Sequence, residues 1–241
     1  MKIIDIHAHY GKWFFPIFKT SIPCILEILR KNNIQKAIMC SSKALYYSPE
    51  EGNRELAHAV KKAKELYAYL FLNPNYVELA RQDIKRYLSM DKFVGVGELY
   101  SGEVIGAPFD CDGHRKIFEF LQDNYPAKPV LCHADPSQIS NVARDFPGLT
   151  FILAHCYDWN NAVLAAQRCS NIYLEICAQQ PRNKLEDLVR GVGAERVLFG
   201  SDLSLLPPEK TLGMIMDSEI SDMEKETILY RNALRLFKFT Q

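Results

Sequence analysis

The feature that most constrains this chain is a regular alternation between short apolar runs and segments with helical periodicity. Eight runs are rich in β-branched and aromatic residues, and the segments between them repeat apolar residues every three or four positions. The runs cover residues 3–7, 36–40, 67–72, 93–99, 129–133, 150–155, 172–176 and 196–200. Strands that alternate with helices pair in parallel, and nearly continuous apolar strands are typical of a sheet covered on both faces. Eight such units in 241 residues predict a closed (β/α)8 barrel, a fold that typically takes roughly 250 residues.

We expect the chain to form one domain over residues 1–241. An open, doubly wound sheet is the main alternative, but that fold usually carries fewer strands. The 12 glycines and 12 prolines are scattered as turn residues and do not gather into a linker. The stretch 10–22 is long for a βα loop and rich in aromatic residues. It is interpreted either as a lid or wall over a site or as a small separate core under a long loop.

Charge and cysteine content narrow the classes of function. Lys+Arg 29 and Asp+Glu 29 cancel, which argues against a nucleic-acid or membrane partner but leaves a local basic patch open. The seven cysteines show no C-x-x-C spacing, and they are interpreted as reduced thiols of a cytoplasmic protein. No signal-peptide pattern opens the sequence, and no apolar stretch approaches the roughly 18 residues of a membrane span. The oligomeric state is left open.

Side chains that can bind metal gather at the C-terminal ends of the predicted strands. In a parallel barrel all of these ends open onto one face, where barrel enzymes keep their chemistry. Six residues from five different runs are therefore predicted to converge on one divalent metal site. They are His7, His9, Glu98, His133, His155 and Asp202.

The spacing of the first histidine pair has a direct structural meaning. Successive strand side chains alternate between faces, so His7 and His9 are predicted to project to the same side. Asp5 shares that side, where it either binds imidazole N–H groups or makes a purely structural hydrogen bond. The face toward the surrounding helices is then predicted to carry Ile4, Ile6 and Ala8.

Two further motifs connect this set to a known family. They are Arg196-Val-Leu-Phe-Gly-Ser-Asp202-Leu203 and Tyr230-Arg-Asn-Ala-Leu-Arg-Leu-Phe237. Together with His7-Ala8-His9, they resemble the amidohydrolase superfamily, and within it the amidohydrolase-related family of metal-dependent hydrolases. The resemblance covers residues 3–237. It implies a distorted (β/α)8 barrel that holds one or two divalent metals, with zinc as the expected ion.

The resemblance also implies a role for each predicted ligand. His7, His9 and Asp202 would hold the more buried metal, and Asp202 would also shuttle the proton. In one-metal members His133 joins this set and His155 is left to hydrogen-bond the substrate. In two-metal members His133 and His155 hold the second ion. Asp202 and His155 are therefore the candidate catalytic residues.

Glu98 departs from the common two-metal pattern. Many two-metal members bridge their ions with a carbamylated lysine after the fourth strand, and the sequence around Glu98 contains no lysine at that position. A glutamate at this place resembles the TatD-type deoxyribonucleases. If Glu98 binds metal, its charge can offset two dications, and we favour two ions on this ground. If it points away, it anchors a loop and the site holds one ion.

The leading functional prediction is a metal-dependent hydrolase that acts on an amide, lactone or ester bond of a small molecule. A suitably held divalent ion lowers the pKa of its bound water from about 15.7 toward 7, and Asp202 would accept the water's proton. The sequence has neither the G-x-S-x-G elbow of serine hydrolases nor a nucleotide-binding glycine motif. Three alternatives stay open: a TatD-like phosphoesterase or deoxyribonuclease, a zinc-dependent decarboxylase, and a non-enzymatic barrel used for binding.

The remaining candidates are less specific. Arg182, Tyr100 and Trp13 lie in loops predicted on the active face. Arg182 is the strongest substrate-binding candidate, because arginine can hold a carboxylate with two hydrogen bonds. His58 and His114 fall in predicted helices and are expected at the surface.

Overall fold

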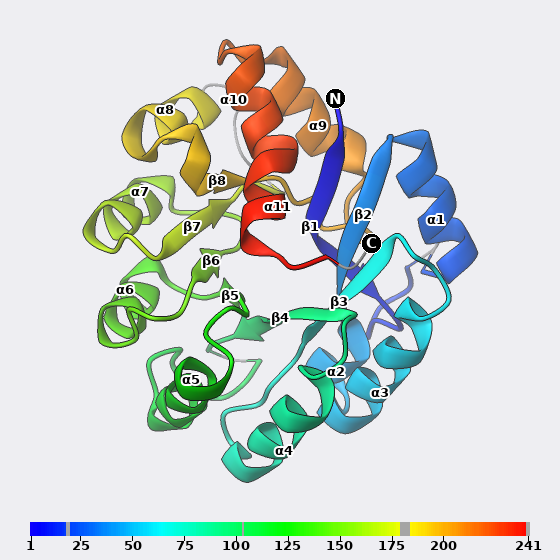
Figure 1. Cartoon of the computed structure of the whole chain (residues 1–241), viewed down its shortest axis with the longest axis vertical. Helices are drawn as coiled ribbons and strands as arrows, with labels where there is room; N and C mark the ends of the chain where they lie inside the picture. Colours follow the sequence, from blue (N-terminus) through cyan, green and yellow to red (C-terminus); the bar gives the residue numbers. More distant parts are fainter. Residues whose placement is uncertain (18–19, 103, 179–183, 240–241) are drawn as a thin grey trace.

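In the computed structural model, eight parallel strands form one sheet in chain order, with helices on its outer side (Figure 1). The strands are β1 (Ile3–Tyr10), β2 (Ile34–Ser41), β3 (Leu66–Leu70), β4 (Phe93–Tyr100), β5 (Val130–His133), β6 (Phe151–Leu153), β7 (Ile172–Glu175) and β8 (Val197–Leu198). The structure describes residues 1–17, 20–102, 104–178 and 184–239. The predicted (β/α)8 barrel is confirmed, and each of the eight predicted runs overlaps one strand.

Backbone hydrogen bonds between β1 and the segment around β8 close the barrel. The N–H of Ile6 donates to the carbonyl oxygen of Phe199 at 3.1 Å. One position further, the carbonyl oxygen of His7 accepts from the N–H of Asp202 at 2.8 Å. Ala8 then forms a parallel bridge with Leu203. This closure brings the first and last predicted ligands of the chain together.

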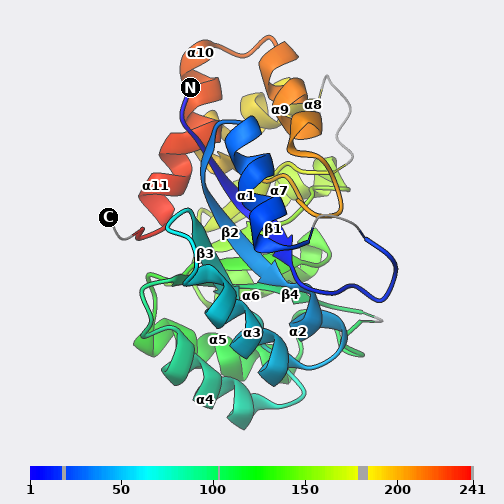
Figure 2. The same ribbon diagram turned by 90° about the vertical axis from the view of Figure 1, so that its right-hand side faces the viewer.

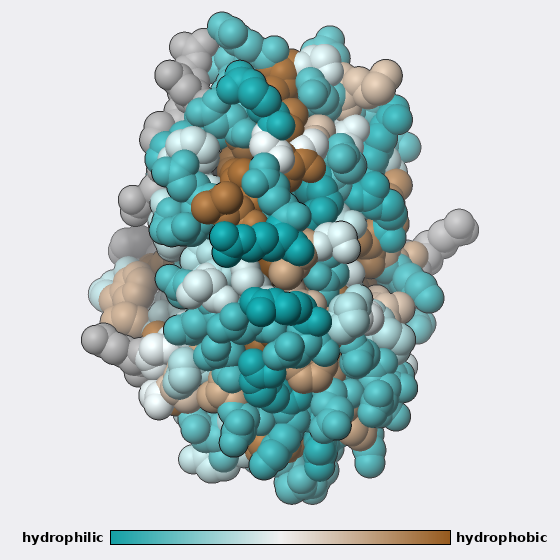
Figure 3. Space-filling model, turned by 90° about the vertical axis from the view of Figure 1, so that its left-hand side faces the viewer, coloured by the Kyte–Doolittle hydropathy of each residue, from teal (hydrophilic) through white to brown (hydrophobic). Residues whose placement is uncertain are grey.

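Most of the helices form the outer layer of the barrel, and α11 (Asn232–Leu236) lies across one of its ends. The other helices are α1 (Ile22–Lys31), α2 (Ser42–Tyr46), α3 (Pro49–Val60), α4 (Val77–Tyr87), α5 (Asp112–Asn124), α6 (Pro136–Asp145), α7 (Trp159–Arg168), α8 (Lys184–Val192), α9 (Pro208–Asp217) and α10 (Asp222–Glu226). The face around α6, α7 and α8 is mostly hydrophilic, with a few separate hydrophobic areas, as expected of amphipathic helices (Figure 3). No helix within the described ranges combines the length and the apolar character that crossing a bilayer requires.

The two ends of the barrel are different. The N-terminus and α11 lie on one side of the barrel, and the described part of the loop that follows β1 projects on the opposite side (Figure 2). Ala233 and Phe237 of the C-terminal segment pack onto the inner apolar cluster and close the N-terminal end of the strands. Asn232 fixes this segment by donating from its side chain to the carbonyl oxygen of Val197 at 2.7 Å. The strand C-termini are left for the predicted site.

A β-bulge in β1 changes which side chains face inward. Between Asp5 and Ala8, β1 advances by three residues while β2 advances by two. An extra residue of this kind reverses the inside–outside alternation of everything that follows it. Ile4 and Ile6, before the bulge, belong to the inner cluster, so the prediction that they face the helices is wrong. Ala8, after it, packs in the outer layer as predicted.

His114 contradicts the surface position predicted for it. It lies in α5 and is fully buried. Its ring packs 4.8 Å from that of Phe109 and is stacked 5.5 Å from that of Phe118, measured between ring centroids. Burial lowers the pKa of His114 to about 4. His58, in α3, is exposed as predicted.

We expect His114 to make the fold sensitive to mild acid. The pKa of His114 is lower in the folded chain than the roughly 6.5 of a histidine in the unfolded chain. Above about pH 6.5 the histidine is neutral in both states, and the folded state has its full stability. The contribution of His114 is lost as the pH falls toward 4, and a shift of this size is worth on the order of 3 kcal/mol. Urea unfolding at pH 7, 5 and 4 should show a smaller acid-induced loss in His114→Phe than in the native chain. His58→Gln is the matched control, and equal losses in all three proteins would contradict the prediction.

Candidate metal centre

Glu98, at the end of β4, is the point where the predicted ligands meet. Its side chain is buried, and its two oxygens face different histidine pairs. Oε2 lies 3.3 Å from Nε2 of His7 and 3.5 Å from Nε2 of His9. Oε1 lies 2.9 Å from Nδ1 of His133 and 3.4 Å from Nε2 of His155. The carboxylate therefore stands between two donor groups that come from opposite parts of the barrel.

Asp202 completes the first of these groups. Its Oδ1 lies 3.1 Å from Nε2 of His9, and the side chain is nearly buried. β8 ends at Leu198, so Asp202 lies in the turn beyond the strand, with a φ of 58°. His155 likewise follows the end of β6 and has a φ of 65°. Such left-handed backbone is strained in residues other than glycine and is often found where function fixes a side chain.

The atoms at the centre fit a divalent metal. Nε2 of His7 and Oε2 of Glu98 are buried and have no hydrogen-bond partner in the described part of the chain. Buried polar atoms are normally paired. One ligand atom each of His7, His9 and Glu98 lie within 4.8 Å of one another, and the same holds for Glu98, His133 and His155. Imidazole nitrogens and carboxylate oxygens are donors that zinc and manganese accept.

The charges of the centre also suit a cation. Burial by itself would raise the pKa of Glu98, but the charge of His7 and the hydrogen bonds from His133 and His155 hold that pKa well below its usual value. Burial opposes ionisation of Asp202 too, and the hydrogen bond from His9 keeps its pKa lowered. Both carboxylates are therefore ionised at neutral pH.

Asp5 has a structural role. Its carboxylate accepts from the backbone N–H of His7 at 3.1 Å and from the backbone N–H of Ser201 at 3.0 Å. It also accepts from the hydroxyl of Ser201. No hydrogen bond to an imidazole ring accompanies these contacts in the described residues. Asp5 thus joins β1 to the turn that carries Asp202.

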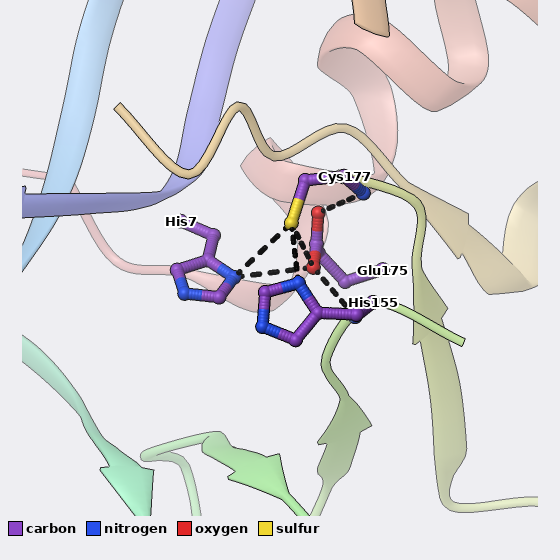
Figure 4. A group of neighbouring side chains, drawn as sticks. All are labelled: His7, His155, Glu175 and Cys177. Atoms are coloured by element: carbon purple, nitrogen blue, oxygen red, sulfur yellow. Dashed lines mark hydrogen bonds and ion pairs between the residues drawn. The ribbon is translucent and has the colours of Figure 1, made fainter. Parts of the chain in front are cut away.

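Glu175, at the end of β7, was missed by the sequence reasoning. It is fully buried, and its Oε2 lies 3.1 Å from Nδ1 of His7 (Figure 4). The sequence does contain a feature that could have identified it: Glu175 is a lone carboxylate in the apolar run 172–176, near a strand end, as Glu98 is.

Gly200 leaves the space that His7 and Glu175 occupy. A Cβ at Gly200 would lie 2.3 Å from Oε1 of Glu175 and 2.7 Å from Cβ of His7. We expect Gly200→Ala to cost about 1–3 kcal/mol by overpacking and to lower the metal content. Thermal unfolding and metal analysis check this. Gly213→Ala is the control, since a Cβ there meets no atom within 4 Å. Gly200→Ala behaving like the control would contradict the packing argument.

A groove of about 450 Å³ opens beside His133. Tyr100, predicted to contact substrate, lines it, with its ring 4.3 Å from the ring of His133. Tyr157 lines it as well, stacked 4.9 Å from the ring of His155. These aromatic rings form a wall next to the second donor group. Arg182 lies outside the described residues.

Trp13 forms a wall on the other side of the centre. Its ring lies 4.9 Å from that of His9, and its indole N–H donates to the hydroxyl of Ser204 at 3.1 Å. The next two residues, Phe14 and Phe15, are exposed. The loop after β1 therefore contributes a side chain to the site, and its aromatic residues also pack on one another and on Tyr46, with Trp13 and Phe14 lying 5.5 Å and 4.8 Å from that ring.

Comparisons with known proteins agree with this architecture. A model of the family described as "Amidohydrolase" matches residues 48–239. No curated protein matches the chain.

Three solved structures of similar fold show the range of relatives. The chain is 12% identical to 5-carboxyvanillate decarboxylase from Sphingomonas paucimobilis, with a TM-score of 0.75 and 99% of each chain covered. It is 16% identical to a dihydroxybenzoic acid decarboxylase from Polaromonas sp. JS666 with bound manganese and an inhibitor, with a TM-score of 0.77 and coverage of 98% and 96%. It is 13% identical to a probable 2-pyrone-4,6-dicarboxylic acid hydrolase from Acinetobacter baumannii, with a TM-score of 0.73 and coverage of 98% and 99%. At these identities the likeness shows the fold alone.

Proposed function

Since this chain belongs to the amidohydrolase family, we propose that it is a two-metal hydrolase bridged by Glu98, acting on an amide, lactone or ester bond of a small molecule. The position of Glu98 carries the proposal, because each of its oxygens faces a separate histidine pair. One ion would be held by His7, His9, Asp202 and Glu98. The other would be held by His133, His155 and Glu98. Zinc or manganese suits both donor sets.

Asp202 is the proposed proton carrier. Bound divalent ions supply Lewis acidity and lower the pKa of water from about 15.7 toward 7. The carboxylate of Asp202 is ionised and lies at the centre next to His9. It can accept the proton of the attacking water and pass it to the leaving group.

The charge of the groove favours a neutral substrate over a phosphodiester. Asp135 and Asp158 are the charged side chains among the described residues that line it. Both are N-caps, of α6 and α7. A nuclease would need basic side chains along the path of the phosphates, so the TatD-like alternative has less support here.

A decarboxylase is the second candidate. Two of the three compared structures are decarboxylases of aromatic acids, and one of them holds manganese. The aromatic wall of Tyr100 and Tyr157 would suit a planar ring. The same metal ligands are compatible with hydrolysis and with decarboxylation, so the identity of the substrate distinguishes the two reactions.

We further propose that the enzyme works in the cytoplasm on a small molecule. None of the seven cysteines, all of which lie in the described ranges, forms a disulfide, and five of them are buried. Free thiols in this number are typical of proteins from a reducing compartment.

A substrate screen with Zn²⁺ or Mn²⁺ tests the proposal. It should include esters, lactones, amides, a phosphodiester and a hydroxybenzoate. We expect turnover of an ester, lactone or amide that chelation abolishes and added metal restores. Release of carbon dioxide from the hydroxybenzoate alone would support the decarboxylase. A purified chain that binds no metal would reject both enzymatic functions and favour a binding role.

A further inference from the structure

His7 and His155 use opposite ring nitrogens for two different purposes. Each presents its Nε2 to Glu98, at 3.3 Å and 3.4 Å respectively. Each turns its Nδ1 to the other side, toward β7 and the residues after it (Figure 4). There Nδ1 of His7 lies 3.1 Å from Oε2 of Glu175, and Nδ1 of His155 lies 2.9 Å from Sγ of Cys177.

Glu175 and Cys177 are themselves joined. The thiol of Cys177 donates to Oε2 of Glu175 at 3.1 Å, and the backbone N–H of Cys177 donates to Oε1 at 2.6 Å. Oε2 also accepts from the backbone N–H of His155 at 3.0 Å. All of these side chains are buried. The carboxylate of Glu175 therefore reaches His7 directly and His155 through the thiol of Cys177, whose Sγ also lies 3.7 Å from Nδ1 of His7.

We propose that Glu175 and Cys177 are positioning residues that fix the rings of His7 and His155 with Nδ1 protonated and Nε2 directed toward Glu98 and the metal site. In this arrangement Nδ1–H of His7 donates to Glu175, and Nδ1–H of His155 donates to the sulfur of Cys177. The thiol hydrogen then donates to Glu175. The assignment of Nε2 as the metal-binding atom rests on the proposed two-metal function.

The consequence is that one buried carboxylate supports one ligand of each ion. His7 belongs to the group with His9 and Asp202, whereas His155 belongs to the group with His133. Groups that hold the second nitrogen of a metal-binding histidine typically contribute 10–100-fold in metal affinity. Loss of Glu175 should therefore weaken both ions. Loss of Cys177 should weaken mainly the ion bound by His155, because Sγ lies 2.9 Å from Nδ1 of His155 but 3.7 Å from Nδ1 of His7.

The same four side chains could instead bind a metal between them. Their ligand atoms lie within 4.8 Å of one another, with the thiol as a soft donor. The hydrogen bonds favour the positioning role, because Nδ1 of each histidine already has a partner on this side. The unpaired atom of His7 is Nε2, on the side of Glu98. A third ion is thus an outcome that the test must distinguish.

Zinc titration against a competing chelator tests the proposal. We expect two ions in the native chain, one of them weakened 10–100-fold in Cys177→Ala, and both weakened in Glu175→Gln. Cys177→Ser should restore binding, because a hydroxyl can also donate and accept. Cys132→Ala is the matched control, since Cys132 is equally buried but donates to the carbonyl oxygen of Val130.

Unchanged affinities in Cys177→Ala and Glu175→Gln would overturn the proposal. So would three ions in the native chain that fall to two in Cys177→Ala, because the thiol would then be a ligand. Fewer than two ions in the native chain would reject the two-metal function instead. The positioning role is then judged by NMR of ¹⁵N-histidine-labelled protein, where Cys177→Ala must alter the Nδ1–H signal of His155 more than that of His7, whose Nδ1 lies farther from the thiol. Signals of both histidines that stay unchanged would reject it.

Discussion

Replacing Asp202 with asparagine is expected to lower turnover by a factor of about 10²–10⁴ while most of the metal stays bound. Asparagine keeps the shape of the side chain and one oxygen for the metal, but it cannot take a proton. Asp202 is nearly buried beside His9, and its pKa is lowered by that histidine against the effect of burial. The measurement is kcat on the substrate identified by screening, together with metal content per chain.

The metal content distinguishes a loss of proton transfer from a loss of bound metal as the cause of reduced activity. Asp145→Asn is the control, because Asp145 carries the same carboxylate at the end of α6, paired with Arg115. We expect this variant to match the native chain in both measurements. If Asp202→Asn retains its metal and most of its turnover, another group carries the proton.

Glu98→Gln is expected to reduce the metal content from near two ions per chain to one or none, and to abolish turnover. A neutral amide could not offset the charge of two divalent ions, which the carboxylate of Glu98 would do. The amide nitrogen would also have to face one of the two histidine pairs, where Glu98 presents an oxygen to each. Metal analysis of protein purified without chelator and with Zn²⁺ present measures the change.

A glutamate outside the site provides the comparison. Glu78 lies in the first turn of α4 and pairs with Arg81 at 2.9 Å, so Glu78→Gln repeats the chemical change at the surface. It should leave the metal content at the native value. One ion per chain in both the native protein and Glu98→Gln would reject the bridging role and favour a one-metal site.

The sequence predicted the architecture and the convergence of six side chains because both depend on where strands end. Apolar runs mark the strands, and parallel strands share one C-terminal edge. Glu98 illustrates this, since its place near the end of an apolar run, together with the resemblance to TatD-type enzymes, drew attention to it. Glu175 has a similar place, but no family motif draws attention to it, and its partner His7 is brought to it only by the fold.

The wrong predictions, for His114 and for Ile4 and Ile6, concern contacts that form only in the folded chain. His114 was expected at the surface because a histidine in a helix is commonly solvated. Its burial depends on Phe109 and Phe118, whose rings reach it only in the folded chain. The orientations of Ile4 and Ile6 were wrong because alternation was assumed to run unbroken through β1. A bulge depends on the register with the neighbouring strand, which a single sequence does not contain.

That bulge divides β1 into two halves that can change independently. The half before it fills the barrel with Ile4 and Ile6, and the half after it points His7 and His9 into the centre. On a straight strand Ile6 and His7 would take opposite faces, and the scaffold would have to choose between an apolar interior and the histidine pair. Anyone who transplants this histidine pair into a designed barrel must carry the additional residue with it. The interior of such a barrel could then be redesigned without turning either imidazole away from the ion.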